Sequence, residues 1–290
     1  MTTLRALLAV ALFVTAITPV KAHEFWFAPL TGTLRAGDIA RLTVRVGEYF
    51  EGYLAGLSVP QTIALQQYSA AGTRDLRPLL PAQRMVGEVD VPVTAAGTHL
   101  FAFENQPSMI SLPADRFNAY LHDEGLEFII AQREAEGTAT TPGRERFRRF
   151  VKTLVRVNAR PQDASLPAGV APPKPIDDRT YALETGQRLE IIPVNDPLAL
   201  RPGGVLQLRV LFEKKPLEGA LLKAWHKRGN QTLIIRSRTA ADGTASFDLP
   251  HAGPWMVSVV HMVKVSGVND VDWDSLWGNL TFGVQAAKQP

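Results

Sequence analysis

Six histidines and a few carboxylates are the residues of this 290-residue chain that could hold a metal ion. The most informative is His23, because removal of a secretory leader after Ala22 would make it the first residue. A terminal histidine offers its α-amine nitrogen and its ring Nδ1 to one ion, and such a nitrogen pair suits Cu, Ni or Co. The opposing interpretation is that His23 merely follows a cleavage site and binds nothing.

Residues 1–22 have the three parts of a secretory signal peptide. Arg5 supplies positive charge, and an apolar run over 6–17 is too short to be a stable membrane span. Val20 and Ala22 then place small or aliphatic residues at the two cleavage positions. We therefore expect cleavage after Ala22, no membrane span in the processed chain, and a periplasmic location in a Gram-negative cell.

Two further histidines end apolar strand faces, which makes them candidate partners of His23. In a strand over 220–227, His226 shares a face with apolar residues, and His261 does the same in a strand over 255–265. Either histidine alone is more simply a buried residue whose nitrogens bond to the backbone. Together with His23 they would form a nitrogen-rich site. The carboxylates expected to add an oxygen ligand or to orient a ring are Glu24, Asp270 and Asp272.

The composition excludes several other kinds of site. The chain has no cysteine, so it has no disulfide, no thiolate metal ligand and no cysteine nucleophile. Loss of the leader leaves 29 basic and 28 acidic side chains, which argues against a basic surface for nucleic acid. Phosphate-binding glycine loops, Gly-x-Ser-x-Gly elbows and His-Glu-x-x-His pairs do not occur. Nucleotide-binding and hydrolase functions therefore lose support.

Alternating apolar and polar residues predict β-strands in the first part of the processed chain. The predicted strands are 39–46, 61–68, 85–93 and 98–103. Helical spacing follows over 115–136, and we expect a helical excursion over about 115–152. The segment 151–157 is expected to start as helix and to end as strand. The basic run from Arg144 to Lys152 is interpreted as a solvated or salt-bridged face rather than an anion site.

A proline-rich stretch over 159–180 predicts a linker or a strap across the surface. Beyond it, short strands separated by turn signals predict a second β-sandwich. The expected fold is mainly β, with two immunoglobulin-like or prealbumin-like β-sandwich domains and a helical insertion in or after the first. The expected divisions are a signal peptide (1–22), a first domain (23–158), the linker (159–180) and a second domain (181–290).

Short segments spread over nearly the whole processed chain resemble, in the same order, a bacterial family of unknown function that is often labelled as a periplasmic component of nickel uptake. The segments that carry the resemblance are 22–26, 45–52, 117–121, 143–147, 224–226, 253–255, 260–262, 272–273 and 275–277. The resemblance implies a soluble periplasmic protein that binds Ni or Co and passes it toward an importer. A metal importer or an outer-membrane receptor is the partner that it implies.

The leading hypothesis is therefore a transition-metal-binding protein, without catalytic turnover, that captures Ni, Co or Cu and supports its uptake or delivery. One alternative is a carbohydrate-binding or structural pair of β-sandwich modules, in which tryptophans form either a sugar platform or simply core. Those tryptophans are Trp225, Trp255, Trp273 and Trp277. A second alternative is a copper oxidase that uses the amino-terminal histidine chelate.

Overall fold

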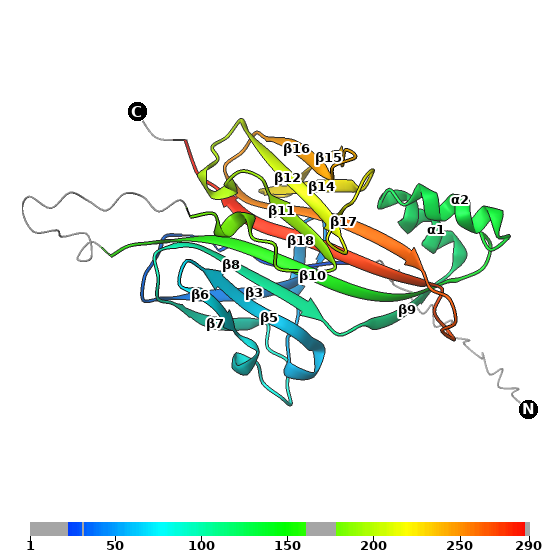
Figure 1. The fold of residues 1–290 in the computed structure, drawn as a ribbon, viewed down its shortest axis with the longest axis horizontal. Coiled ribbons are helices and arrows are strands. Elements are labelled where there is room, and N and C mark those ends of the chain that lie inside the picture. Colours follow the sequence, from blue (N-terminus) through cyan, green and yellow to red (C-terminus); the bar gives the residue numbers. More distant parts are fainter. Residues whose placement is uncertain (1–22, 31, 161–177, 288–290) are drawn as a thin grey trace, which may run out of the picture.

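A computed structural model describes residues 23–30, 32–160 and 178–287 of the chain. The predicted signal peptide and residues 161–177 of the predicted linker lie outside the described residues. The described part is mainly β, with strands arranged in sandwich-like layers and two α-helices at one end (Figure 1), which confirms the predicted fold class. No helix among the described residues is both long and apolar enough to cross a membrane.

The strands of the first half form a sandwich around one apolar core. A sheet built from β1, β3 and β4, with β7 paired to β3, packs against part of a larger sheet that contains β5, β8 and β10. In β7, Val89, Val91 and Val93 are buried and alternate with exposed residues, as the sequence predicts for a half-buried strand. The strands are β1 (Glu24–Phe27), β2 (Leu34–Arg35), β3 (Asp38–Glu48), β4 (Glu51–Leu54), β5 (Thr62–Ser69), β6 (Gly72–Asp75), β7 (Glu88–Val93), β8 (Gly97–Asn105), β9 (Ser108–Leu112) and β10 (Gly143–Asn158).

The second half adds a small sheet over the opposite face of the large one. The order β11-β12-β13, with β16 paired to β12, covers an apolar core that includes Leu208, Val257 and Leu280. The strands are β11 (Leu189–Pro193), β12 (Gly204–Phe212), β13 (Lys215–Pro216), β14 (Leu221–Arg228), β15 (Gln231–Arg238), β16 (Thr244–Leu249), β17 (Gly253–Lys264) and β18 (Trp273–Val284). The last of these, β18, is a long buried strand that the sequence pattern did not predict.

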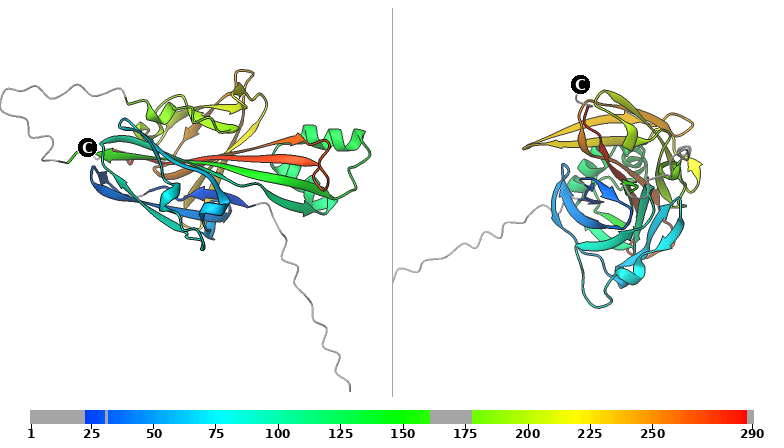
Figure 2. Two further views of the ribbon diagram at one scale, coloured as in Figure 1. Left: turned by 60° about the horizontal axis from the view of Figure 1, so that its bottom comes forward. Right: turned by 90° about the vertical axis from the view of Figure 1, so that its left-hand side faces the viewer.

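One ten-stranded sheet runs through both halves of the chain. Its order is β15-β14-β17-β18-β10-β8-β5-β6, and β2 and β9 also pair with β10. The junction is the parallel pair β10 and β18, in register from Glu145 opposite Trp273 to Thr153 opposite Thr281; these strands lie side by side along the molecule (Figures 1 and 2). The two halves predicted as separate sandwiches therefore share a sheet.

Two α-helices cover one end of this sheet. They are α1 (Ala114–Asp123) and α2 (Glu127–Ala135), and their buried faces pack on β17 and β18. The turn between them contains Gly125, whose φ of 71° is left-handed. The helical excursion thus ends at residue 135, and the prediction that it reaches about 152 is wrong because 143–158 forms β10, which is hydrogen-bonded between β9 and β18. Short 3₁₀ turns lie at Val59–Gln61, Arg77–Leu79, Thr180–Ala182 and Pro197–Ala199.

Candidate metal site beside the amino-terminal strand

The first described strand holds the backbone next to His23 in a fixed place. All four residues of β1 are buried, and the strand pairs antiparallel with β3, with Glu24 opposite Gly47. One further step in this register puts His23 opposite Glu48. The side-chain amide of Asn279 donates to the Phe25 carbonyl oxygen at 2.8 Å, which ties β1 to β18 in the large sheet. The site is therefore built on sheet rather than on a loop.

The turn that follows β3 has a strained backbone. Glu48 pairs with Glu51 across a two-residue hairpin, and the residues between them, Tyr49 and Phe50, have φ values of 54° and 57°. Two left-handed residues make the kind of turn that favours Asn-Gly, and a bulky side chain there costs on the order of 1–3 kcal/mol. Such strain is found mainly where the surroundings enforce it, commonly at functional sites.

Two glycines at the base of this hairpin allow the strands to approach closely. A Cβ atom added to Gly47 would lie 2.1 Å from the Glu51 carbonyl oxygen, and one added to Gly52 would lie 2.3 Å from that of Val46. The ring of Trp26 lies against Gly52 and would be 2.9 Å from the added atom. The pattern Gly-Glu-Tyr-Phe-Glu-Gly over 47–52 is thus a compact hairpin whose first carboxylate is held beside His23.

The His23 ring faces the Glu48 carboxylate at the edge of the sheet. Its Nε2 lies 4.0 Å from Oε1 of Glu48, and the two side chains are 35% and 28% exposed. On the backbone side, Nη2 of Arg149 donates to the His23 carbonyl oxygen at 3.5 Å. A carboxylate beside Nε2 favours the tautomer with the proton on Nε2 and leaves the Nδ1 lone pair available. That nitrogen, with a free α-amine, is the one needed for the chelate.

Glu24 lies in the interior rather than at this exposed edge. Burial raises the pKa of its carboxyl group, while hydrogen bonds to Ser258 and Asn279 and the charges of Lys223 and Arg149 act in the opposite direction. Its Oε1 atom is buried without a hydrogen-bond partner among the described residues. Glu24 therefore faces the large sheet and is not placed as a ligand beside the His23 ring.

His226 is a buried residue of β14 with a structural partner. Its Nδ1 donates to the Pro254 carbonyl oxygen at 2.9 Å, and its ring is stacked on Trp255 with centroids 4.7 Å apart. The ring of His251 also lies beside that of His226, with their centroids 5.2 Å apart. Burial lowers the pKa of His226, so the ring is neutral near pH 7.

His261 lies farther along the same sheet, in β17. Its ring contacts Phe212 and Phe128, with centroids 4.5 Å and 6.1 Å away, and burial lowers its pKa to about 4. Trp255, which pairs with His226, is six residues before His261, a separation of about 20 Å along a strand. No group of three or more histidines, aspartates and glutamates suited to a metal ion occurs among the described residues. The structure does not gather the three predicted histidines.

Asp270 and Asp272 bind an arginine instead of facing a histidine. Nη2 and Nε of Arg144 donate to the two carboxylate oxygens of Asp272 at 2.6 Å and 3.0 Å, and Nη1 lies 3.5 Å from Oδ1 of Asp270. The hydrogen bonds from Arg144 hold the pKa of Asp272 below its usual range. These contacts tie the loop between β17 and β18 to the start of β10.

Two residues of the site were not nominated from the sequence. The alternation of apolar and polar residues in β3 does not mark Glu48 as a functional residue. Only the two glycines on either side of the segment 48–51, Gly47 and Gly52, indicate an unusual turn there. Arg149 belongs to the basic run that was interpreted as a salt-bridged face. That interpretation is confirmed for Arg144, Arg146 and Arg148, which pair with Asp272, Asp274 and Glu104. Arg149 has no carboxylate oxygen within 4.0 Å among the described residues.

The fold and the hairpin site define a mainly β protein with a histidine at the start of its first strand. The chain belongs to the family described as a domain of unknown function (DUF4198), whose model matches residues 20–263. The matched region includes His23, the 47–52 hairpin and Arg149, and it ends before β18. Membership in a family of unknown function is thereby confirmed, and no curated protein matches the chain.

The solved structures that match the chain belong to longer proteins, and their superpositions on this chain have low TM-scores. They include dimeric latent PorU from Porphyromonas gingivalis, at 9% identity and a TM-score of 0.19 over 91% of this chain and 20% of that one. A point mutant of Salmonella alpha-2-macroglobulin matches at 11% identity and a TM-score of 0.19, over 94% of this chain and 16% of that one. Three N-terminal domains of the bacteriophage RB49 highly immunogenic outer capsid protein match at 10% identity and a TM-score of 0.17. That match covers 89% of this chain and 59% of the other. This chain spans a fifth or less of the first two proteins, and at these TM-scores we infer no shared function from the matches.

Proposed function

We propose that the protein is a periplasmic transition-metal-binding protein, which captures Ni or Co, or Cu, through His23 and supports uptake or delivery of the ion. The observation that carries the proposal is the placement of His23 against Glu48 at the start of a buried strand. After cleavage before residue 23, the α-amine and Nδ1 would chelate the ion, and Glu48 would hold the ring from its far side. The other predicted ligands take no part in this version of the site.

The chemistry of the donor set selects the class of metal. An amine and a neutral imidazole are nitrogen donors, which suit Ni(II), Co(II) and Cu(II) better than Mg(II) or Ca(II). A ring held by an outer carboxylate is also the usual arrangement around a metal-bound histidine. Two protein nitrogens leave the remaining coordination positions open to water or to another ligand, as release to an importer requires.

The sugar-platform alternative loses support from burial. All five tryptophans of the chain are among the described residues, and each is no more than 6% exposed. A flat aromatic surface for a sugar ring needs exposed faces, and these side chains are core. We therefore retain metal binding as the proposed function.

Calorimetric titration of Ni(II), Co(II) and Cu(II) tests the proposal. The protein is processed so that it begins at His23 and is compared with a version that carries one extra residue before it. We expect binding to the first and at least a hundredfold weaker binding to the second, because the extension removes the amine donor. Equal affinities, or no binding by either version, would remove the proposal.

A further inference from the structure

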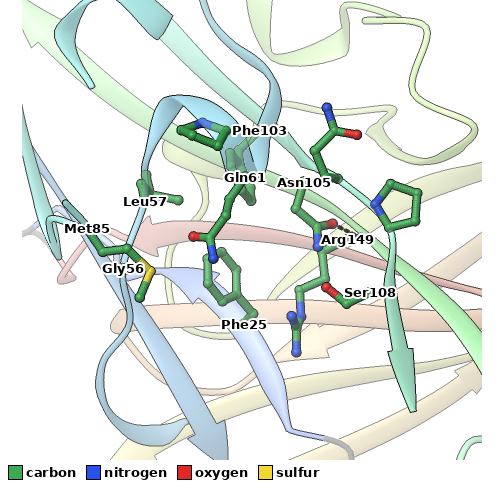
Figure 3. A pocket seen from close by; sticks show the side chains of 12 residues that line it. Phe25, Gly56, Leu57, Gln61, Met85, Phe103, Asn105, Ser108 and Arg149 are labelled. Carbon is green, nitrogen blue, oxygen red and sulfur yellow. Dashed lines mark hydrogen bonds between the residues drawn. The ribbon is translucent and has the colours of Figure 1, made fainter. Parts of the chain in front are cut away.

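A pocket of about 260 Å³ is lined by Phe25 and by Arg149, the residue that donates to the His23 carbonyl oxygen. Its walls come from β1, β8, β9, β10 and the segments around the 3₁₀ turn at 59–61 (Figure 3). Ligand sites for drug-sized molecules usually measure roughly 300–1,000 Å³, so this pocket fits a smaller molecule. The side chains of Phe25, Gln61 and Arg149 lie around the same hollow (Figure 3).

The guanidinium group of Arg149 lies against two aromatic rings and keeps unused donors. The carbon Cζ lies 5.1 Å from the ring centroid of Phe25 and 4.7 Å from that of Phe147, so aromatic rings pack against the guanidinium group. Its Nε–H is buried without a hydrogen-bond partner among the described residues, and Nη2 makes only the long bond to the His23 carbonyl oxygen. A guanidinium fork that is held in plane and has unused donors matches the geometry of a carboxylate.

The charge of Arg149 is not balanced by contact with an acid. Its neighbours Arg144, Arg146 and Arg148 each pair with a carboxylate, whereas no carboxylate of the described chain lies within 4.0 Å of Arg149. Burial lowers the pKa of Arg149 to about 10, with the charge of Glu24 acting the other way, so the group is still a cation near pH 7. A cation of this kind attracts an anion into the pocket.

The remaining walls supply neutral donors and apolar surface. Asn105 uses its side-chain oxygen to accept from the Arg149 backbone N–H at 2.6 Å, which leaves its NH₂ group as a donor. Gln61 and Ser108 add an amide and a hydroxyl, and none of the twelve lining residues is acidic. Phe25 and Phe103 form the buried apolar wall. The combination suits an acid with a hydrocarbon body rather than a bare inorganic anion.

We propose that this pocket is a binding site for a small organic carboxylate, whose carboxylate group is bound by the Arg149 guanidinium and whose hydrocarbon part lies against Phe25 and Phe103. The pocket adjoins His23 through the bond from Arg149 to the His23 carbonyl oxygen, and Arg149 is the residue that the two sites share. The proposed metal donors are atoms of His23, which does not line the pocket. The proposal therefore does not depend on metal binding at His23.

Isothermal titration of the metal-free processed protein with benzoate tests the proposal. We expect saturable binding, at least tenfold weaker binding of benzamide, which keeps the ring without the charge, and weaker binding of inorganic phosphate. Arg149→Gln should weaken benzoate binding at least tenfold. Arg236→Gln, at an exposed arginine of β15, is the matched control and should leave benzoate binding unchanged.

If Arg149→Gln does not fold, a second variant tests whether benzoate binds in this pocket. Gln61 is exposed at the rim of the pocket, so Gln61→Trp fills the opening without disturbing the core and should abolish benzoate binding. Absence of benzoate binding with a Kd below about 10 mM overturns the proposal. The proposal is equally overturned if phosphate binds more tightly than benzoate, or if benzoate binding survives Gln61→Trp. Titration of Ni(II) into the same samples reports the metal site separately.

Discussion

Replacement of Glu48 by glutamine should weaken metal binding at His23 by 10- to 100-fold, because the carboxylate orients the ring for the metal ion. Loss of the outer partner of a metal-binding histidine typically costs that factor in affinity, the equivalent of about 1.4–2.7 kcal/mol. Glu48 is placed to be such a partner, since its Oε1 lies 4.0 Å from Nε2 of His23. Both side chains are about a third exposed, so solvent screening favours the lower end of this range.

The assay is calorimetric titration of Ni(II) into the processed protein and two variants. Glu51→Gln is the matched control, since Glu51 is the partner of Glu48 across the same hairpin and its side chain is 69% exposed toward Lys227. Glu51→Gln should change the Ni(II) affinity less than threefold. If Glu48→Gln and Glu51→Gln bind Ni(II) equally well, Glu48 does not support the His23 ring in metal binding.

Three further predictions concern the scaffold. Gly52→Ala places a Cβ atom 2.3 Å from a backbone oxygen, so it should destabilise the protein by about 1–3 kcal/mol in urea denaturation and weaken Ni(II) binding. Gly283→Ala is the control, because its added Cβ atom meets no atom within 4 Å. Equal stability of the two variants would contradict the close approach of the strands at Gly52. Burial raises the pKa of Glu145 to about 7, so the native state binds more protons than the unfolded state between about pH 4.5 and 7, and stability should fall by up to about 3 kcal/mol as pH rises through that window. Burial raises the pKa of Glu124 to about 7 as well, so Glu145→Gln should reduce this fall without abolishing it in urea titrations at pH 5 and 8. An unchanged pH profile would show that Glu145 does not contribute to it. Lys152→Met leaves the carboxylate of Glu190, which lies 2.5 Å from Nζ, buried without its cation and should cost about 3–5 kcal/mol by chemical denaturation; a loss below 1 kcal/mol would contradict the pairing.

Much of the fold could be predicted because local patterns decide half-buried strands. The alternation over 39–46 lies within β3, and the spacing over 115–136 corresponds to α1 and α2. The strand β18 was missed because nearly every residue is buried, so it has no alternation, and its Asp, Ser, Gly and Asn residues resemble turn signals. Its parallel pairing with β10 joins residues 128 apart, as in Glu145 and Trp273. No local pattern encodes such a contact.

The candidate site was only partly predictable for the same reason. His23 could be nominated from cleavage chemistry, which depends on neighbouring residues alone. Its partner Glu48 follows from the register of β1 on β3 and from a turn that places two aromatic residues at positive φ. Arg149 differs from its basic neighbours only because acids far away in the sequence pair with them and not with it.

The most direct test of metal binding at the amino terminus is the Ni(II) affinity of the protein that begins at His23, measured beside the same protein with one extra residue in front. We expect tight binding that the extension weakens at least a hundredfold, because the amine and Nδ1 can no longer chelate one ion. Unchanged affinity after the extension would mean that the amine and the ring of His23 do not bind the ion together.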